Sequence, residues 1–389
     1  MTENGRYLEF VESLRLAESP ESASASEMRL RPLFGGGRIG SSLVYFNPWD
    51  CAAWKTWMDV SFSTRREKSG LFRDMVRALI REYRPIARDR RPRAIYSQRL
   101  PGAVMLLRNQ KLIVIDRIRG LVFHVLRSEY DSERRLLECE MTASRVLPEQ
   151  TIPVLHAHLE QSPRFFVQAY LRHELQTWRE LLPRLGIILA ALFRYYSYFG
   201  FRAVDPVDYV DRLAAACRER LKSVSLPEAG EVENQLAKIV EAIRARAAAL
   251  APSRIVLTQV HGDFISAHVV MRWDAVESGG FAITDWSESH EYSVFHDLFY
   301  FHFQNYESNF VGQVLGFQPE QLTVFFGGGA ERLAGEFQER WKQKLTAEYL
   351  QLNFLVCFVQ ELEHRLVRLR GQVVDFWAQQ AEKMLVTKS

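Results

Sequence analysis

The chain has 389 residues, of which 47% are hydrophobic and 25% are charged, and its formal net charge is +3. This ordinary composition provides ample material for a core, and the length suffices for about two to three domains. The longest apolar run, residues 185–193, is too short to span a bilayer, and the N-terminus lacks the apolar core of a secretory signal. The four cysteines are scattered without a C-x-x-C pair, which argues against a zinc ribbon and favours a reducing, cytoplasmic location.

Residues 1–100 are expected to form an N-terminal extension that is partly flexible. The small polar stretch ESPESASASE at 18–27 is typical of a linker, and residues 70–84 have the pattern of a helix. Residues 65–99 carry twelve Arg or Lys residues and four Asp or Glu residues. This block is either a solvated helix face with a basic loop, or a surface for an anionic partner such as lipid head groups. No specific nucleic-acid-binding motif accompanies it.

Residues 101–172 read as a small β-rich lobe. Three short aliphatic and β-branched runs, at 103–108, 111–116 and 121–127, predict an antiparallel meander. Residues 132–147 then show apolar residues at helical spacing, and residues 163–171 form another strand-like run. The predicted order of elements in this lobe is therefore β-β-β-α-β.

Residues 173–389 read as a large, mainly helical lobe. The predicted helices cover residues 177–200, 206–223, 228–250, 331–350 and 351–385. Only the strand-like runs within 254–286 interrupt them. The fold class predicted from this pattern is α+β with two lobes, and a crevice between lobes is a common place for a ligand.

Two acidic residues follow strand-like runs in the second half of the chain. Asp263 lies in VHGDF, directly after one apolar run, and Asp285 ends the run FAIT. We expect the two acids to lie on adjacent strand ends and to face the same crevice. One carboxylate could then hold a metal ion while the other orients a hydroxyl and takes its proton, a division that suits phosphoryl transfer.

In these segments the sequence resembles the aminoglycoside phosphotransferase and choline kinase family, which has the protein-kinase-like fold. The family's loop reads H-G-D-x-x-x-x-N, and it is followed by a strand ending in D-W/F-E/D and then by D-L. Here the loop has HGD at 261–263 and His268 at the position of the Asn, followed by DWS at 285–287 and DL at 297–298. The order and the spacing of all three elements agree with the family pattern.

The resemblance implies an ATP-dependent phosphotransferase that acts on a hydroxyl of a small molecule, such as a sugar, an aminoglycoside-like compound or an amino alcohol. It implies that Asp263 is the catalytic base. It also implies that Asp285, which follows the strand-like run FAIT, is the main ligand of Mg²⁺. Asp297 would brace the helical lobe. His268 would be a second metal ligand, and its nitrogen would suit a softer ion such as Mn²⁺.

The resemblance also extends into the β-rich lobe. The run FFVQAYL looks like the last strand of that lobe leading into a hinge, where the backbone would meet an adenine edge; the residues concerned are Gln168, Ala169, Tyr170 and Leu171. Glu140 lies where the family has a helix glutamate. Its partner in the family is a strand lysine, and Arg127 is the residue assigned to that position here.

Three departures from the family pattern leave a second function open. His268 replaces Asn, Arg127 replaces Lys, and the turn at 108–111 that would cover the phosphates lacks glycine. His268 could alternatively be a packing histidine, and arginine and lysine are not interchangeable at a phosphate site. The alternative to an enzyme is a catalytically inactive pseudokinase that acts as a binding or regulatory module.

Other motifs do not support a different activity. GGGRIG at 35–40 matches G-x-G-x-x-G, but it lies far ahead of Arg127 and is expected to be a flexible turn. The histidines show no H-E-x-x-H spacing, and no G-x-S-x-G sequence occurs, so a zinc hydrolase and a serine hydrolase are both disfavoured.

Overall fold

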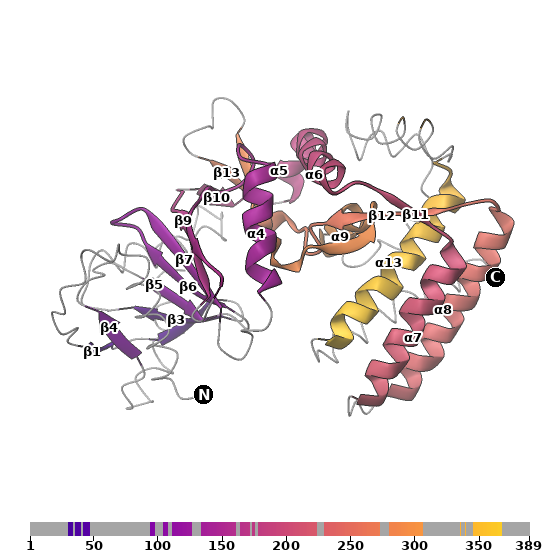
Figure 1. The fold of residues 1–389 in the computed structure, drawn as a ribbon, viewed down its shortest axis with the longest axis horizontal. Helices are drawn as coiled ribbons and strands as arrows, with labels where there is room; N and C mark the ends of the chain where they lie inside the picture. The colour runs from indigo at the N-terminus through magenta and orange to yellow at the C-terminus, as the bar shows by residue number, and fades with distance from the viewer. Residues whose placement is uncertain are drawn as a thin grey trace. The chain divides into compact units, whose positions relative to one another are not determined.

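The computed structural model places the chain in two compact units (Figure 1). The first unit comprises residues 1–175 and 269–287, and the second comprises residues 176–268 and 288–389. Residues described by the structure are 30–33, 36–39, 42–46, 94–97, 104–107, 111–126, 134–160, 164–171, 173–175, 178–223, 229–272, 280–305, 335, 339 and 345–367. The predicted α+β class is confirmed, because the first unit is rich in strands and the second is mainly helical.

A seven-stranded antiparallel sheet with the order β2-β3-β5-β6-β7-β9-β8 dominates the first unit. Its strands are β2 (Gly36–Ile39), β3 (Ser42–Phe46), β5 (Val104–Leu107), β6 (Lys111–Asp116), β7 (Leu121–Leu126), β8 (Val154–His158) and β9 (Phe165–Ala169). The predicted meander is present as β5, β6 and β7, which pair in sequence order.

The sheet is larger than the sequence pattern predicted. The sequence pattern did not predict strand β8, because VLHAH is a run of five residues interrupted by two histidines, and short strands are common at the edge of a sheet. Strands β2 and β3 from the N-terminal extension continue the sheet beyond β5. Residues 36–39, expected to be a flexible turn, are strand β2, because hydrogen bonds to β3 outweigh the low strand propensity of glycine. A separate antiparallel pair joins β1 (Leu30–Leu33) to β4 (Ala94–Ser97).

Helix α4 (Arg135–Val146) packs against β7 and β9 through an apolar cluster (Figure 1). The buried residues of this cluster are Leu126, Leu136, Leu137, Leu159 and Phe166. Glu140 follows Leu136 and Leu137 at helical spacing, so it lies on the same buried face of α4. The amphipathic pattern of α4 therefore directs one carboxylate toward the interior of the first unit.

The hairpin of β13 (Val269–Arg272) and β14 (Phe281–Ile283) belongs to the first unit, not to the helical part as predicted. Its third strand is β10 (His173–Leu175), which pairs with β13. The hairpin is fastened to the turn after α4, because the Ile283 amide donates to the Gln150 carbonyl at 2.8 Å. This attachment fixes the end of β14, where Asp285 follows.

Helices make up most of the second unit. They are α5 (Trp178–Leu181), α6 (Leu185–Phe199), α7 (Pro206–Ser223), α8 (Ala229–Ala249), α9 (His296–Asn305) and α13 (Ala347–Val367). Helix α13 packs against both α7 and α8, and the three run side by side in Figure 1. The described part of the unit also contains a small sheet of β11 (Arg202–Val204), β12 (Ile255–Val260) and β15 (His290–Ser293).

Two predictions about the second half of the chain were wrong. The predicted helix boundary at 350/351 does not exist, since α13 is continuous and residues 351–362 within it are buried on every face. The strands before Asp263 and Asp285 are not neighbours: β12 pairs with β11 and β15, whereas β14 pairs with β13. No helix among the described residues is long and apolar enough to cross a membrane.

Truncating a buried side chain of α4 that packs against the sheet should lower the stability of the first unit. Leu137→Ala empties a site that is 0% exposed, and we expect it to lower the free energy of unfolding by about 2 to 5 kcal/mol. Arg145→Ala, on the exposed face of the same helix, should change it by less than about 0.5 kcal/mol. Urea denaturation followed by circular dichroism measures both, and equal effects would contradict the packing described for α4.

Candidate active site

Lys111 lies in the first unit between two carboxylates. It is the first residue of β6, and its side chain is only 7% exposed. Its Nζ atom lies 3.5 Å from Oε1 of Glu140 on α4 and 3.3 Å from Oδ1 of Asp285 after β14. Three segments far apart in the sequence thus meet at one ammonium group.

The two carboxylates keep Lys111 charged despite its burial. Burial alone lowers the pKa of the ammonium, but the attraction of Asp285 and Glu140 and their hydrogen bonds outweigh it and raise the pKa above its ordinary value. Glu140 is 4% exposed, so this is a desolvated cation held against acidic partners. Because this ammonium is already largely desolvated, binding an anionic ligand costs little further loss of hydration.

The sequence reading did not single out Lys111. It assigned the strand cation to Arg127, which lies outside the described residues. A signal was available, because Lys111 is the only lysine in the predicted meander of residues 103–127. The structure pairs Glu140 with Lys111, and the predicted pairing of Glu140 with Arg127 stays a prediction.

Asp285 is held in an unusual backbone conformation. Its φ is +60°, in the left-handed region that residues with a side chain rarely adopt. Its Oδ1 atom accepts hydrogen bonds from Lys111 Nζ and, at 2.9 Å, from the hydroxyl of Ser287. The side chain is nevertheless 38% exposed. Strain of this kind persists where the surroundings impose it, and it is common at functional sites.

The end of β9 holds the residues predicted to meet an adenine edge. The amide of Ala169 donates to the carbonyl of Pro153 at 3.2 Å, and that of Tyr170 donates to the carbonyl of Gly120 at 2.7 Å. The Gln168 side chain is buried and lies 3.5 Å from the Ile152 carbonyl. Two predicted donors thus already bind protein carbonyls, and half-buried Leu171 follows them. The adenine contact stays a prediction.

In the second unit, the HGD segment that follows β12 is held by the carboxylate of Asp297. The amides of His261 and Gly262 donate to its two oxygens at 2.7 and 2.9 Å. The hydroxyl of Tyr196 donates to the same carboxylate at 2.6 Å. Asp297 is 0% exposed. It therefore fixes the backbone immediately before Asp263, in keeping with the bracing role implied for it.

Asp297 stays ionised inside the protein. Burial raises the pKa of its carboxyl, but the close contact with the charged His296 ring opposes this effect, and the net pKa lies below the ordinary value. An ionised carboxylate forms stronger hydrogen bonds to backbone amides than a neutral acid does. The loop is consequently anchored by charge-assisted bonds.

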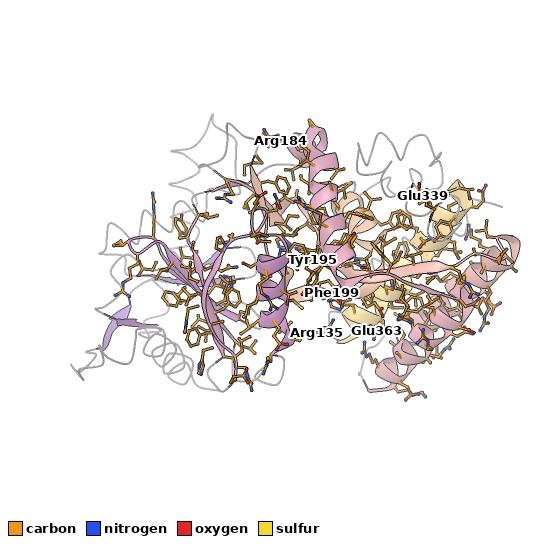
Figure 2. The ribbon with its side chains drawn as sticks, turned by 45° about the horizontal axis from the view of Figure 1, so that its top comes forward. Arg135, Arg184, Tyr195, Phe199, Glu339 and Glu363 are labelled. Carbon is orange, nitrogen blue, oxygen red and sulfur yellow. The ribbon has the colours of Figure 1, made fainter. Side chains whose placement is uncertain are left out.

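Hydrogen bonds of three hydroxyl groups hold the strand that leads into the same loop. The Ser289 hydroxyl donates to the Val260 carbonyl at 2.6 Å and lies 2.9 Å from the hydroxyl of Tyr195 (Figure 2). The Thr258 hydroxyl donates to the Gly200 carbonyl at 2.9 Å. These bonds tie the second half of β12, up to its last residue, to α6 before the chain enters the loop.

His261 and His268 frame Asp263. His261 is 0% exposed, and its Nδ1 accepts a hydrogen bond from the Asp263 amide at 3.3 Å, so the ring helps to hold the loop backbone. His268 Nδ1 lies 2.7 Å from the Asp263 carbonyl. A carbonyl only accepts, so Nδ1 carries the proton, and in the neutral ring the lone pair is on Nε2. The Asp263 side chain remains 30% exposed.

Gly262 allows the tight turn between these residues. Its φ is +87°, and a Cβ atom at this position would lie 2.2 Å from the carbonyl oxygen of Glu288. Both the backbone conformation and the close approach of residue 288 therefore require glycine.

The predicted site residues thus form two clusters, one in each unit. Lys111, Glu140 and Asp285 form the first, and Asp263, His268 and Asp297 form the second. Convergence of Asp263 and Asp285 on one cleft stays a prediction. Among the described residues, no three or more His, Cys, Asp or Glu side chains gather so that they could hold a metal ion by themselves.

Known proteins similar to this chain are found among solved structures. No protein-family model matches the chain, and no curated protein does. Among solved structures, it is similar to a thermostable mutant of aminoglycoside phosphotransferase APH(4)-Ia in complex with ADP and hygromycin B, at 14% identity and a TM-score of 0.43, over 72% of this chain and 92% of that one. It is also similar to choline kinase LicA from Streptococcus pneumoniae, at 12% identity and a TM-score of 0.45, over 72% and 91%. A glucosamine kinase is similar at 14% identity and a TM-score of 0.39, over 71% and 76%.

Replacing Gly262 should damage the loop more than replacing an open glycine. We expect Gly262→Ala to destabilise the protein by about 2 to 5 kcal/mol, because left-handed backbone strain adds to a steric collision. Gly200→Ala is the matched control, since Gly200 has a φ of +79° but nothing within 4 Å of the added Cβ. Its cost should be only about 1 to 2 kcal/mol. Denaturant unfolding compares the two, and equal losses would contradict the close contact with Glu288.

Proposed function

We propose that this chain transfers the γ-phosphoryl group of ATP to a hydroxyl group of a small molecule. The observation that carries the proposal is the buried Lys111 ammonium between Glu140 and Asp285. Phosphoryl transfer depends mainly on positioning and on neutralising charge, so it needs a fixed cation, a carboxylate for a divalent ion and a base. The side chains of the two clusters supply groups of all three kinds.

Lys111 would contact the phosphates of the nucleotide. Its charge is retained in the buried site, and Glu140 holds the ammonium from the side of α4. Asp285 would then be the partner that changes contacts when the nucleotide binds, because it is the more exposed of the two carboxylates. Arg127, which lies outside the described residues, is not required for this role.

Asp285 fits a divalent ion of the magnesium type. It offers a carboxylate that is 38% exposed at the end of a strand, and Mg²⁺ prefers oxygen ligands and keeps several waters or substrate phosphates in its shell. A single protein carboxylate on the ion is therefore compatible with Mg²⁺. When bound, the ion would neutralise the charge that develops on the phosphates.

His268 favours an ion that accepts nitrogen. Its Nδ1–H is held by the Asp263 carbonyl at 2.7 Å, which is the arrangement found for histidines that bind a metal through Nε2. A nitrogen ligand suits Mn²⁺ better than Mg²⁺. We therefore infer that Mn²⁺ supports the reaction at least as well as Mg²⁺.

Asp263 would act on the acceptor. Its carboxylate would accept the proton of the substrate hydroxyl while the hydroxyl oxygen bonds to the γ-phosphorus and the bond from that phosphorus to ADP breaks. The backbone around Asp263 is fixed by Asp297 and His268, so the carboxylate needs little reorganisation. The acceptor class proposed is a sugar, an aminoglycoside-like compound or an amino alcohol.

A binding module without turnover is the second candidate function. The observation that favours it is His268, because a histidine locked to the Asp263 carbonyl could serve the loop alone. Contact of the basic block at 65–99 with anionic lipids would suit either function, and this block lies largely outside the described residues.

Lys111→Met tests the phosphate contact. The substitution keeps the length of the side chain and removes its charge, so we expect kcat/KM for ATP to fall about a hundredfold or more. Lys222→Met on the exposed surface of α7 is the control and should leave the rate unchanged. The measurement is ATP consumption with a panel of small hydroxyl acceptors, in Mg²⁺ and in Mn²⁺. Turnover by Lys111→Met at the wild-type rate would refute the assignment.

Asp263→Asn separates catalysis from binding. We expect kcat to fall by a factor of about 10² to 10⁴ while the affinity for ATP, measured by calorimetry, stays the same. Asp208→Asn, in the first turn of α7, is the matched control. If the wild-type protein binds ATP but no acceptor promotes its consumption with either ion, the binding module is the correct function.

A further inference from the structure

His296, which precedes the loop-holding residue Asp297 in the chain, lies between two buried carboxylates. It is the first residue of α9, and its Nε2 atom is 2.7 Å from Oε1 of Glu361 on α13. Its Nδ1 atom is 3.6 Å from Oδ1 of Asp297, a distance too long for a good hydrogen bond but short for a charge contact. His296 and Glu361 are each 1% exposed. A continuous path therefore leads from α13 through α9 to the loop.

The charge state of His296 follows from these neighbours. Burial lowers the pKa of the ring, but the contacts with Asp297 and Glu361 raise it to about 9. The other rings around it are Tyr300 on α9, with centroids 5.8 Å apart, and Tyr292 and His290 on β15, at 4.9 and 6.4 Å. At neutral pH the group is thus an imidazolium between two carboxylates.

Stability alone does not account for this arrangement. Three charged groups removed from water incur a large desolvation cost, and well-packed apolar side chains are often at least as stable in such places. Helix α13 buries mainly apolar residues, among them Leu352, Phe354, Leu355, Val356 and Phe358, and it also buries the uncharged polar residues Gln351, Asn353 and Gln360. Glu361 is the charged member of this buried set, and it contacts His296, which lies beside the carboxylate that holds the loop.

We propose that His296 and Glu361 are a positioning pair that, acting through Asp297, sets the geometry of the loop carrying Asp263. The inference rests on the proposed function for its kinetic consequence, but its structural part does not. Glu361 orients the ring, the ring places positive charge beside Asp297, and Asp297 holds the amides of His261 and Gly262. Neither His296 nor Glu361 touches the reacting atoms in this scheme.

A pH dependence follows from the scheme. When His296 loses its proton, Asp297 loses the cation that orients it, so its carboxylate is held less firmly toward the two amides. The rate constant kcat should therefore fall at alkaline pH with the midpoint of the His296 titration, while the KM for ATP changes little. A purely structural pair would lower the rate by the same factor at every pH.

Glu361→Gln is the test variant. It keeps the shape of the side chain but removes one of the two anions that favour the imidazolium, so the alkaline midpoint of kcat should drop by about 1 to 3 pH units. Glu361→Asp keeps the anion and should leave the midpoint close to that of the wild type. Glu363→Gln is the matched control, because Glu363 lies on the same helix and pairs instead with Arg220 (Figure 2).

Two readouts are independent of turnover. The His296 titration is followed by NMR of the imidazole carbons, and the protection of the His261 and Gly262 amides is followed by hydrogen exchange over the same pH range. We expect amide protection to fall with the His296 midpoint in the wild type, and at lower pH in Glu361→Gln. Protection that does not follow the titration would overturn the inference, whether or not the protein consumes ATP.

The outcomes also distinguish this inference from the proposed function. Coupled titration and exchange without any turnover would support the positioning pair and refute the kinase activity. Turnover whose alkaline limb is unchanged in Glu361→Gln would support the activity and refute the pair. Should Glu361→Gln fail to fold, the wild-type titration and Glu361→Asp still decide the question.

Discussion

The first unit depends on one buried ion cluster. The ammonium of Lys111 can remain charged away from water only because Glu140 and Asp285 lie 3.5 and 3.3 Å from it. The amphipathic pattern of α4 directs Glu140 toward the ammonium. The hydrogen bond from the Ile283 amide to the Gln150 carbonyl fixes the end of β14, where Asp285 follows. The cluster therefore links sheet, helix and hairpin, and it leaves one carboxylate partly open to solvent.

The second unit uses a carboxylate in the opposite way. Asp297 is fully buried and binds backbone amides rather than a side-chain cation, so it shapes the loop and leaves Asp263 exposed. The positive φ of Gly262 and the close approach of Glu288 make this shape specific. In both units, a buried charge holds a neighbouring acid that remains accessible. This division between a holding group and an accessible group is what a phosphotransferase site requires.

Much of this organisation could be predicted from the sequence, because it depends on local patterns. The meander is predicted by short aliphatic and β-branched runs, helix α4 by helical periodicity, and the HGD loop by the order and spacing of its motifs. The errors concern long-range pairing. Strand β8 is an edge strand with a weak pattern, and the placement of β12 and β14 in different sheets depends on partners far along the chain. Lys111 was missed because its role depends on two partners that no local pattern reveals, and His296 and Glu361 were missed for the same reason.

The most direct measurement is a crystal structure of the full chain with a nonhydrolysable ATP analogue and Mg²⁺ or Mn²⁺. The account predicts that phosphate oxygens lie within hydrogen-bonding distance of Lys111 Nζ, with the Asp285 carboxylate on the metal ion and Glu140 still beside the ammonium. A nucleotide bound at another place, with the contacts between Lys111 and both carboxylates unchanged, would contradict it.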